Sequence, residues 1–271
     1  MLALTISGLL SLAFPPPAHA GEGGYRLLEL DGYKVKWGDR RLGAGASISY
    51  AFARESLRFD DARNCGDMES IEMLSGKALS MVSLVHEAAA AFRVWENVAD
   101  LSFHEVGNAR DADIVIGTQG RPRGRAFANV TYVAAPEGDV RTIEQSLVCL
   151  NPDHGWKVGF DGDTNNYDIR YTLIHEIGHA IGLDHPGPFG QVMAFSYTEA
   201  FEDLQPGDVL GVRHLYGPAN SFDARLAEMP AETNHDSVLT NQPVMNTTLG
   251  LGNPSCQSQQ EKLLCGTVEQ Q

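Results

Sequence analysis

The sequence predicts an α+β fold, in which a twisted, mixed sheet of about five strands is combined with three helices. The clearest sign is an amphipathic helix from Lys77 to Asn97, where apolar residues recur at intervals of three and four. Short segments with the alternating or apolar composition of strands lie before and after it. A second helix, from about Asp168 to Ile181, has two histidines one turn apart.

The first 20 residues have the pattern of a signal peptide. An apolar run from Leu2 to Phe14 is followed by three prolines and by Ala18-His19-Ala20, whose small residues suit a signal-peptidase site. We expect cleavage before Gly21 and a secreted or periplasmic protein. A membrane anchor is the alternative, but the run of 13 residues is too short to cross a bilayer.

Strands are expected on both sides of the long helix. Residues 21–44 form a glycine-rich N-terminal segment with one short strand near 33–37. In the next segment Ile48, Tyr50 and Phe52 fall on one face, as in a half-buried strand. A polar loop over residues 54–75 separates this strand from the helix. The expected strands are Ala46–Phe52, Leu101–Val106, Ala112–Ile116, Ala126–Val133 and Leu147–Leu150.

The last part of the chain divides at Gly217-Pro218, a pair that stops helices. Before it, a final helix is expected around Asp208–Tyr216, after a loop at 151–167 and the histidine-bearing helix. Beyond it, residues 219–271 are rich in Asn, Gln, Ser, Thr and Glu and have little periodicity. We expect a polar, largely disordered tail there and one folded domain over residues 45–218.

Charge and cysteine content limit the classes of partner. The chain carries 35 acidic and 20 basic side chains, a net charge of −15, so it would repel phosphate backbones and anionic lipids. We therefore expect neither nucleic acid nor a membrane as partner. We also expect the protein to be a monomer. The even count of cysteines in an exported chain predicts two disulfides, for which three pairings are possible. We predict Cys65–Cys149 and Cys256–Cys265.

Residues 175–185 contain the motif H-E-x-x-H-x-x-G-x-x-H. His175 and His179 are four residues apart on a helix, so both imidazoles can face one ion. Gly182 allows the chain to turn back after the helix, and His185 can then supply a third ligand. Three neutral imidazoles hold Zn²⁺ with one position open for water, which is the catalytic arrangement. Glu176, beside them, is placed to take a proton from that water.

The chain resembles the matrixin-type metzincins, of the secreted bacterial kind, over roughly residues 33–217. The resemblance implies a zinc peptidase with His175, His179 and His185 as ligands and Glu176 as general base. It also implies that Met193 is the Met-turn residue beneath the metal, followed by a substrate pocket that includes Phe195 and Tyr197. The segments that carry it, besides the histidine motif, are Ala91-Phe92-x-x-Trp95, Leu101-x-Phe103-x-Glu105-Val106, Ala112-Asp113-Ile114-x-Ile116-Gly117 and Asp208-Val209-x-Gly211-Val212-x-x-Leu215-Tyr216-Gly217.

Three features depart from the family pattern. Phe195 stands where matrixins usually have proline after the Met-turn. No histidine lies between residues 105 and 150, where animal matrixins bind a structural zinc, so one zinc ion per chain is expected. Residues 63–66 superficially resemble the cysteine switch of the family's pro-segment, but they follow the first strand of the domain, and a disulfide is the better interpretation of Cys65.

These patterns predict a secreted zinc endopeptidase that takes an extended peptide along the edge of its sheet. Asp161-Gly162-Asp163-Thr164-Asn165 superficially resembles a calcium loop, but it lacks the glycine and the bidentate glutamate that such loops need. Calcium is thus possible but no motif supports it. The alternative function is a zinc-binding peptidase relative, with little or no activity, that acts as a binding module.

Overall fold

The computed structural model describes residues 24–76, 79–120, 124–135 and 137–219. The expected signal peptide, most of the expected tail, and Cys256 and Cys265 lie outside these residues. None of the described helices is both long and apolar enough to span a membrane. The strands are β1 Arg26–Leu27, β2 Glu29–Leu30, β3 Tyr33–Lys36, β4 Ala46–Phe52, β5 Leu57–Arg58, β6 Asp67–Met68, β7 Leu101–Glu105, β8 Ile114–Thr118, β9 Ala126–Tyr132, β10 Val140–Leu150, β11 Gly155–Lys157, β12 Asn166–Asp168 and β13 Leu183–Asp184, and the helices are α1 Met81–Glu96, α2 Ile169–Ala180 and α3 Pro206–Tyr216, with short 3₁₀ turns at Ile71–Leu74 and Ala109–Asp111.

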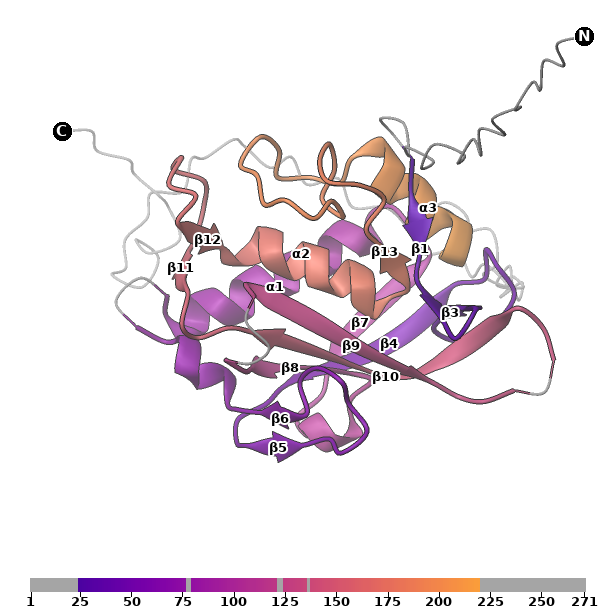
Figure 1. Ribbon diagram of the computed structural model, residues 1–271, viewed down its shortest axis with the longest axis horizontal. Helices are drawn as coiled ribbons and strands as arrows, with labels where there is room; N and C mark the ends of the chain where they lie inside the picture. The colour runs from indigo at the N-terminus through magenta and orange to yellow at the C-terminus, as the bar shows by residue number, and fades with distance from the viewer. Residues whose placement is uncertain (1–23, 77–78, 121–123, 136, 220–271) are drawn as a thin grey trace, which may run out of the picture. The chain divides into compact units, whose positions relative to one another are not determined.

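The main sheet is mixed and has seven strands, with the order β2-β3-β10-β8-β4-β7 and with β9 paired to β10 (Figure 1). β4, β7, β8 and β10 run parallel to their neighbours in this order, whereas β9 is antiparallel to β10, with Leu147 opposite Asn129. All five residues of β8 are buried, as suits a central strand. All seven residues of β9 are only half-buried, because within the described part of the chain β9 has a neighbour on one side only.

Helices α1 and α2 lie together on one face of the sheet, and the small β5–β6 hairpin lies on the other face (Figure 1). The core between helices and sheet is apolar, and Trp95 at its centre is fully buried. The Trp95 indole nitrogen donates to the Ile174 carbonyl at 3.1 Å, which ties α1 to α2. Each of these helices begins at a side-chain cap: Ser80 accepts from the amide of Ser83, and Asp168 accepts from that of Tyr171.

The expected α+β fold class and its central strands are confirmed. The bounds of some elements differ from the expected ones in segments that contain polar residues. The long helix begins at Met81, not Lys77, because Ser80 caps it. β10 begins at Val140, seven residues before the expected strand, although polar residues interrupt its apolar run. It is held there by pairing with β3 and β9, and the Arg141 guanidinium stacks 3.6 Å from the centre of the Tyr33 ring. The two segments expected to be loops contain the short pairs β5–β6 and β11–β12.

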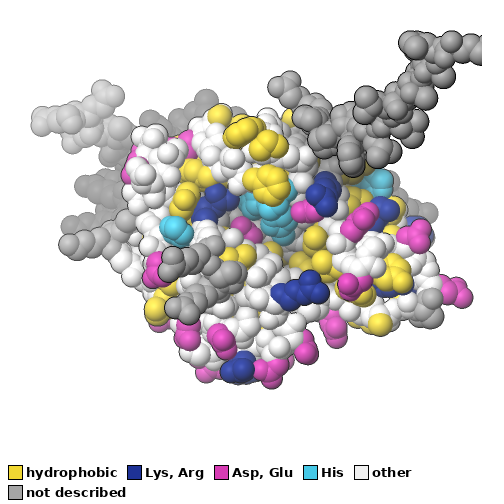
Figure 2. Space-filling view, in the orientation of Figure 1, with side chains coloured by type: hydrophobic (Ala, Val, Ile, Leu, Met, Phe, Trp, Pro, Cys, Tyr) yellow, Lys and Arg dark blue, Asp and Glu magenta, His cyan; other side chains and the backbone are white. Residues whose placement is uncertain are grey.

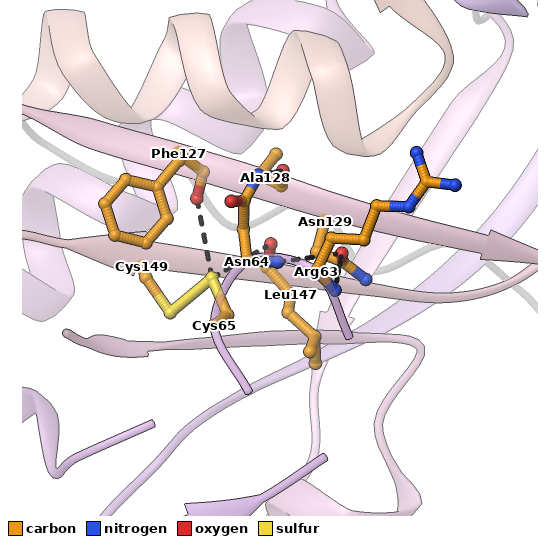
Figure 3. Close-up of a disulfide and its surroundings, with 8 residues drawn as sticks. All are labelled: Arg63, Asn64, Cys65, Phe127, Ala128, Asn129, Leu147 and Cys149. Atoms are coloured by element: carbon orange, nitrogen blue, oxygen red, sulfur yellow. Dashed lines mark hydrogen bonds between the residues drawn. A yellow bond between two sulfur atoms is a disulfide. The ribbon is translucent and has the colours of Figure 1, made fainter. Parts of the chain in front are cut away.

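A disulfide joins Cys65 to Cys149, as the sequence analysis predicts, and links the β5–β6 connection to β10 (Figure 3). Both cysteines are fully buried in a second, smaller apolar cluster on the sheet face opposite α1 and α2. The Asn129 side-chain oxygen on β9 accepts from the backbone amides of Arg63 and Asn64, at 3.0 and 3.2 Å. The β5–β6 connection is therefore bonded to both β9 and β10.

Candidate active site

The end of α2 is held from several directions, and this determines where the three histidines lie. The Trp37 indole and the Ser146 hydroxyl both donate to the Ala180 carbonyl, at 2.9 and 3.0 Å. The Tyr216 hydroxyl donates to the Ile181 carbonyl at 2.8 Å. These side chains satisfy carbonyls that a helix end leaves without partners. Gly182 then turns the chain with a φ of 101°, as the sequence predicts.

The Nε2 atoms of His175, His179 and His185 converge on one point. The three Nε2–Nε2 distances are 3.1, 3.2 and 3.1 Å. The Nδ1 atoms of His175 and His179 face the carbonyls of Val192 and Leu183, at 2.7 and 2.9 Å. Because carbonyls only accept, these Nδ1 atoms carry the protons, and the converging Nε2 atoms carry lone pairs. The His185 Nδ1 atom faces the Asp184 carboxylate at 3.8 Å, which leaves its Nε2 atom free to offer a third lone pair. A cation between the three nitrogens would remove their mutual repulsion.

The donor set fits zinc. Tetrahedral Zn–N bonds of about 2.0–2.1 Å place neighbouring nitrogens about 3.3 Å apart, close to the observed spacing. Burial lowers the pKa of His175 well below its usual value, and burial also lowers the pKa of His185 to about 4. The imidazoles are therefore neutral at pH 7, which is the form that binds metal. Within the described ranges no second group of three His, Cys, Asp or Glu side chains comes together in this way.

Glu176 lies next to this centre and is almost fully buried. Its Oε2 atom has no hydrogen-bond partner in the protein, and the residue lines the same cleft as the histidines. Burial raises the pKa of Glu176 to about 7, and the positive charge of Arg125 opposes the rise. A buried carboxyl oxygen without a partner, at the wall of a cleft, is placed to exchange a proton with a molecule in that cleft.

The cleft has a volume of about 830 Å³ and runs beside the edge strand β9. All of β9 contributes to its wall, together with residues 28–31, with three residues of the disulfide-bonded connection and with Arg125. Figure 2 shows the histidine side chains in a hollow of the surface, with Lys or Arg side chains beside them. An unpaired strand edge next to a metal centre suits an extended peptide.

The segment that follows the third histidine packs on α2 beside the centre, and its Val192 carbonyl faces the His175 Nδ1 atom. Met193 is 2% exposed, and its sulfur packs so closely on α2 that a Cβ at Gly178 would overlap it. The Asp208 carboxylate, at the start of α3, accepts from the backbone amides of Val192 and Met193 at 3.0 and 3.1 Å. Sequence reasoning assigned no such role to Asp208, because the contact joins residues that are distant along the chain.

The two residues expected in the substrate pocket lie in different places. Phe195 is 61% exposed, lines the cleft and stands 4.4 Å from the His185 ring, measured between ring centroids. Tyr197 is not among the residues that line the cleft. Its hydroxyl accepts from the Asp168 amide and donates to Glu199, at 2.9 and 2.8 Å. Tyr197 therefore connects the start of α2 to the segment after Met193.

The segment that resembles a calcium loop is organised around an internal cation. The Lys157 ammonium group donates to the Asp161 carboxylate and, at 2.8 Å, to the Asp163 carbonyl. It also pairs with the Glu199 carboxylate at 2.6 Å. Lys157, which precedes the acidic segment, was not predicted from the sequence to have this role.

Comparison with known proteins agrees with this site. A sequence profile of the Matrixin family matches residues 71–217, which is more than half of the 271 residues. The chain is 33% identical over 166 residues to "Probable matrix metalloproteinase 095L" of Invertebrate iridescent virus 3, an alignment that covers 58% of this chain and 44% of the viral protein. It is 31% identical over 166 residues to "Interstitial collagenase A" of Mus musculus, with 57% and 33% covered.

"Stromelysin-3" of Homo sapiens is 33% identical over 132 residues, with 48% of this chain and 26% of the human protein covered. The chain thus spans less than half the length of these curated relatives. The profile match falls on the part of the chain that contains α1, the sheet strands β7 to β10, and all three histidines. This chain therefore belongs to the matrixin family of metallopeptidases.

Proposed function

We propose that this protein is a zinc-dependent endopeptidase that hydrolyses internal peptide bonds outside the cytoplasm. One observation carries the proposal: three imidazole lone pairs converge beside a buried carboxyl oxygen without a partner, in a cleft along an open strand edge. Neither the converging imidazole nitrogens nor the carboxyl oxygen without a partner stabilises the fold, because buried polar atoms without partners cost free energy. Together they form a centre for hydrolysis.

The residues of the centre have separate roles. His175, His179 and His185 hold the metal, and Met193 forms the floor beneath them. A bound zinc ion supplies a Lewis acid that polarises a carbonyl group and lowers the pKa of water. Glu176 removes a proton from the attacking water and then delivers it to the leaving amine. The Asp208 carboxylate holds the backbone of the floor in place.

The substrate is a peptide in extended conformation, bound antiparallel or parallel to the outer edge of β9. The seven residues of β9 can pair with a substrate segment about 23 Å long, since a strand rises about 3.3 Å per residue. A site of that length takes several residues on either side of a scissile bond, which suits an endopeptidase. Phe195, exposed over the His185 ring, provides an apolar contact for one substrate side chain.

Export is supported by two features of different kinds. The Cys65–Cys149 disulfide is typical of proteins in an oxidising compartment. The pattern of residues 1–20 is that of a signal peptide. We propose in addition that the protein is a monomer with one zinc ion per chain.

Digestion of a peptide library tests this function against a binding module. We expect cleavage at internal bonds that stops when a chelator removes the metal and resumes when zinc is added back. Peptides that bind to the zinc-loaded protein but remain intact after prolonged incubation would show that it is a binding module and not a peptidase.

A further inference from the structure

The Arg125 side chain lies at the wall of the cleft, in the residue just before β9. Arg125 lines the same cavity as His175 and Glu176. Its backbone is fixed by Asn151, whose amide donates to the Arg125 carbonyl at 3.0 Å and whose side chain donates to the Gly124 carbonyl at 2.9 Å. The backbone position of this arginine is therefore set by the fold.

Two aromatic rings hold the guanidinium group of Arg125. Its central carbon lies 5.3 Å from the centroid of the Tyr167 ring and 5.4 Å from that of the Tyr197 ring. Such cation–π contacts orient a guanidinium without neutralising its charge. Tyr197 is itself fixed by its two hydrogen bonds. The aromatic contacts therefore hold the cation at the cleft and leave its charge uncompensated.

Arg125 has no carboxylate partner within 4.0 Å among the described residues, and neither has the exposed Arg63, whereas three other basic side chains have one. Arg26 pairs with Asp184 at 3.0 Å, Lys157 with Glu199 at 2.6 Å and Arg170 with Glu87 at 2.5 Å. The Nε atom of Arg125 is buried and has no hydrogen-bond partner in the protein. This is unexpected in a chain with 35 acidic and only 20 basic side chains.

The uncompensated charge of Arg125 favours an anion in the cleft that it shares with His175 and Glu176. A partly buried cation without a counter-ion costs free energy, and a second cation at the histidines would add repulsion. An anion that enters the cleft removes both penalties. Guanidinium groups bind carboxylates through two parallel hydrogen bonds, so a carboxylate is the matching anion.

We propose that Arg125 determines substrate specificity by binding the carboxylate of an aspartate or glutamate side chain next to the scissile bond. This inference rests on the proposed peptidase function. Arg63 also lines the cleft, but it is exposed to solvent, so a carboxylate that binds it gains less than one that binds the partly buried Arg125.

The test compares peptide pairs that differ only by Glu or Gln at one of the two residues flanking the scissile bond. In the wild type we expect kcat/KM to be on the order of 10- to 100-fold higher for the Glu peptide at one of these positions, as for a hydrogen-bonded charge pair. Arg125→Gln should bring the ratio close to one by slowing cleavage of the Glu peptide alone. Arg125→Lys, which keeps the charge but loses the paired geometry, should retain an intermediate ratio.

Arg110→Gln is the matched control, since it changes the net charge equally at an exposed position outside the cleft. It should keep the wild-type ratio. A wild-type ratio near one, or an Arg125→Gln variant that slows both peptides equally, would overturn the proposal. If Arg125→Gln does not fold, Arg125→Lys decides the matter, and an unchanged wild-type ratio in that variant would overturn the proposal.

Failure of the peptidase function would look different, because then no peptide of either kind is cleaved. In that case the affinities of the same peptide pairs for the zinc-loaded wild type and the Arg125→Gln variant are measured by fluorescence anisotropy. Tighter binding of the Glu peptide that depends on Arg125 would support the inference without turnover. Equal affinities for the Glu and Gln peptides would refute it.

Discussion

Replacing Gly182 by alanine tests how the fold delivers the third histidine. Gly182 has a φ of 101°, a conformation that residues with a Cβ rarely adopt. An added Cβ would also overlap the Val35 carbonyl oxygen and lie 3.2 Å from a methyl group of Leu215. Because the overlapped atom belongs to the backbone of β3, it cannot move aside as the end of a flexible side chain could.

The magnitude follows from two separate effects. The unfavourable φ costs about 1–2 kcal/mol. Overlap in a packed interior adds about 1–3 kcal/mol. Gly182→Ala should therefore lower the free energy of unfolding by about 2–5 kcal/mol. Gly190→Ala is the matched control, because Gly190 has a φ of 97° and nothing within 4 Å of an added Cβ. Gly190→Ala should lower the free energy of unfolding only by the cost of the unfavourable φ, about 1–2 kcal/mol.

The assay is urea denaturation of the metal-free proteins, followed by zinc titration of each. Gly182→Ala should be less stable than Gly190→Ala by at least about 1 kcal/mol, the lower limit of the overlap cost. It should also bind zinc at least about tenfold more weakly, since a displaced turn moves His185 away from the other two ligands. Equal stability of the two variants would refute the role given to the Val35 contact, and unchanged zinc affinity would refute the role given to the turn.

Three further predictions concern features away from the metal. The double change Cys65→Ser and Cys149→Ser should cost about 2–5 kcal/mol, because the disulfide closes a loop of 84 residues, and an unchanged urea midpoint would contradict this. Burial lowers the pKa of Lys36 from 10.5 to about 8. Between pH 8 and 10.5 the unfolded chain therefore holds a proton on Lys36 that the native protein lacks, so the free energy of unfolding rises with pH. From pH 7.5 to 10.5, the free energy of unfolding of the wild type should therefore rise relative to that of Lys36→Met by up to about 3 kcal/mol, and a constant difference would show that Lys36 is not desolvated. In Lys157→Met, the amides of residues 159–166 should exchange hydrogen faster, and calcium should raise the Tm of the variant but not that of the wild type. If the variant keeps the wild-type protection and its Tm does not respond to calcium, the ammonium group has no structural role.

Much of the metal centre could be predicted from sequence because its geometry is local. His175 and His179 share a helix, and Gly182 and His185 follow within six residues, so spacing alone predicts how they converge. Arg125 gave no such signal. Its importance depends on Asn151, on two tyrosines and on the absence of a nearby carboxylate, which are relations between segments distant along the chain.

The same distinction explains the errors in the sheet. Ala46–Phe52 was predicted with its observed bounds because its face alternates within one strand. The first seven residues of β10 were not predicted as a strand because several of them are polar. They are ordered by pairing with the neighbouring strands β3 and β9. Tyr197 was expected in the substrate pocket from its place in the family motif, but its hydroxyl is used to hold the start of α2. Local pattern predicts an element well, and neighbours decide its length and its contacts.

The most direct test of the account is to measure zinc content and peptide turnover on the same sample of Glu176→Gln. Glutamine fills the same space and leaves the three histidines in place, but its amide cannot accept a proton as a carboxylate does. We expect one zinc ion per chain, as in the wild type, with kcat reduced by at least about 100-fold. Full zinc content with wild-type turnover would contradict the central claim that Glu176 is the general base of this centre.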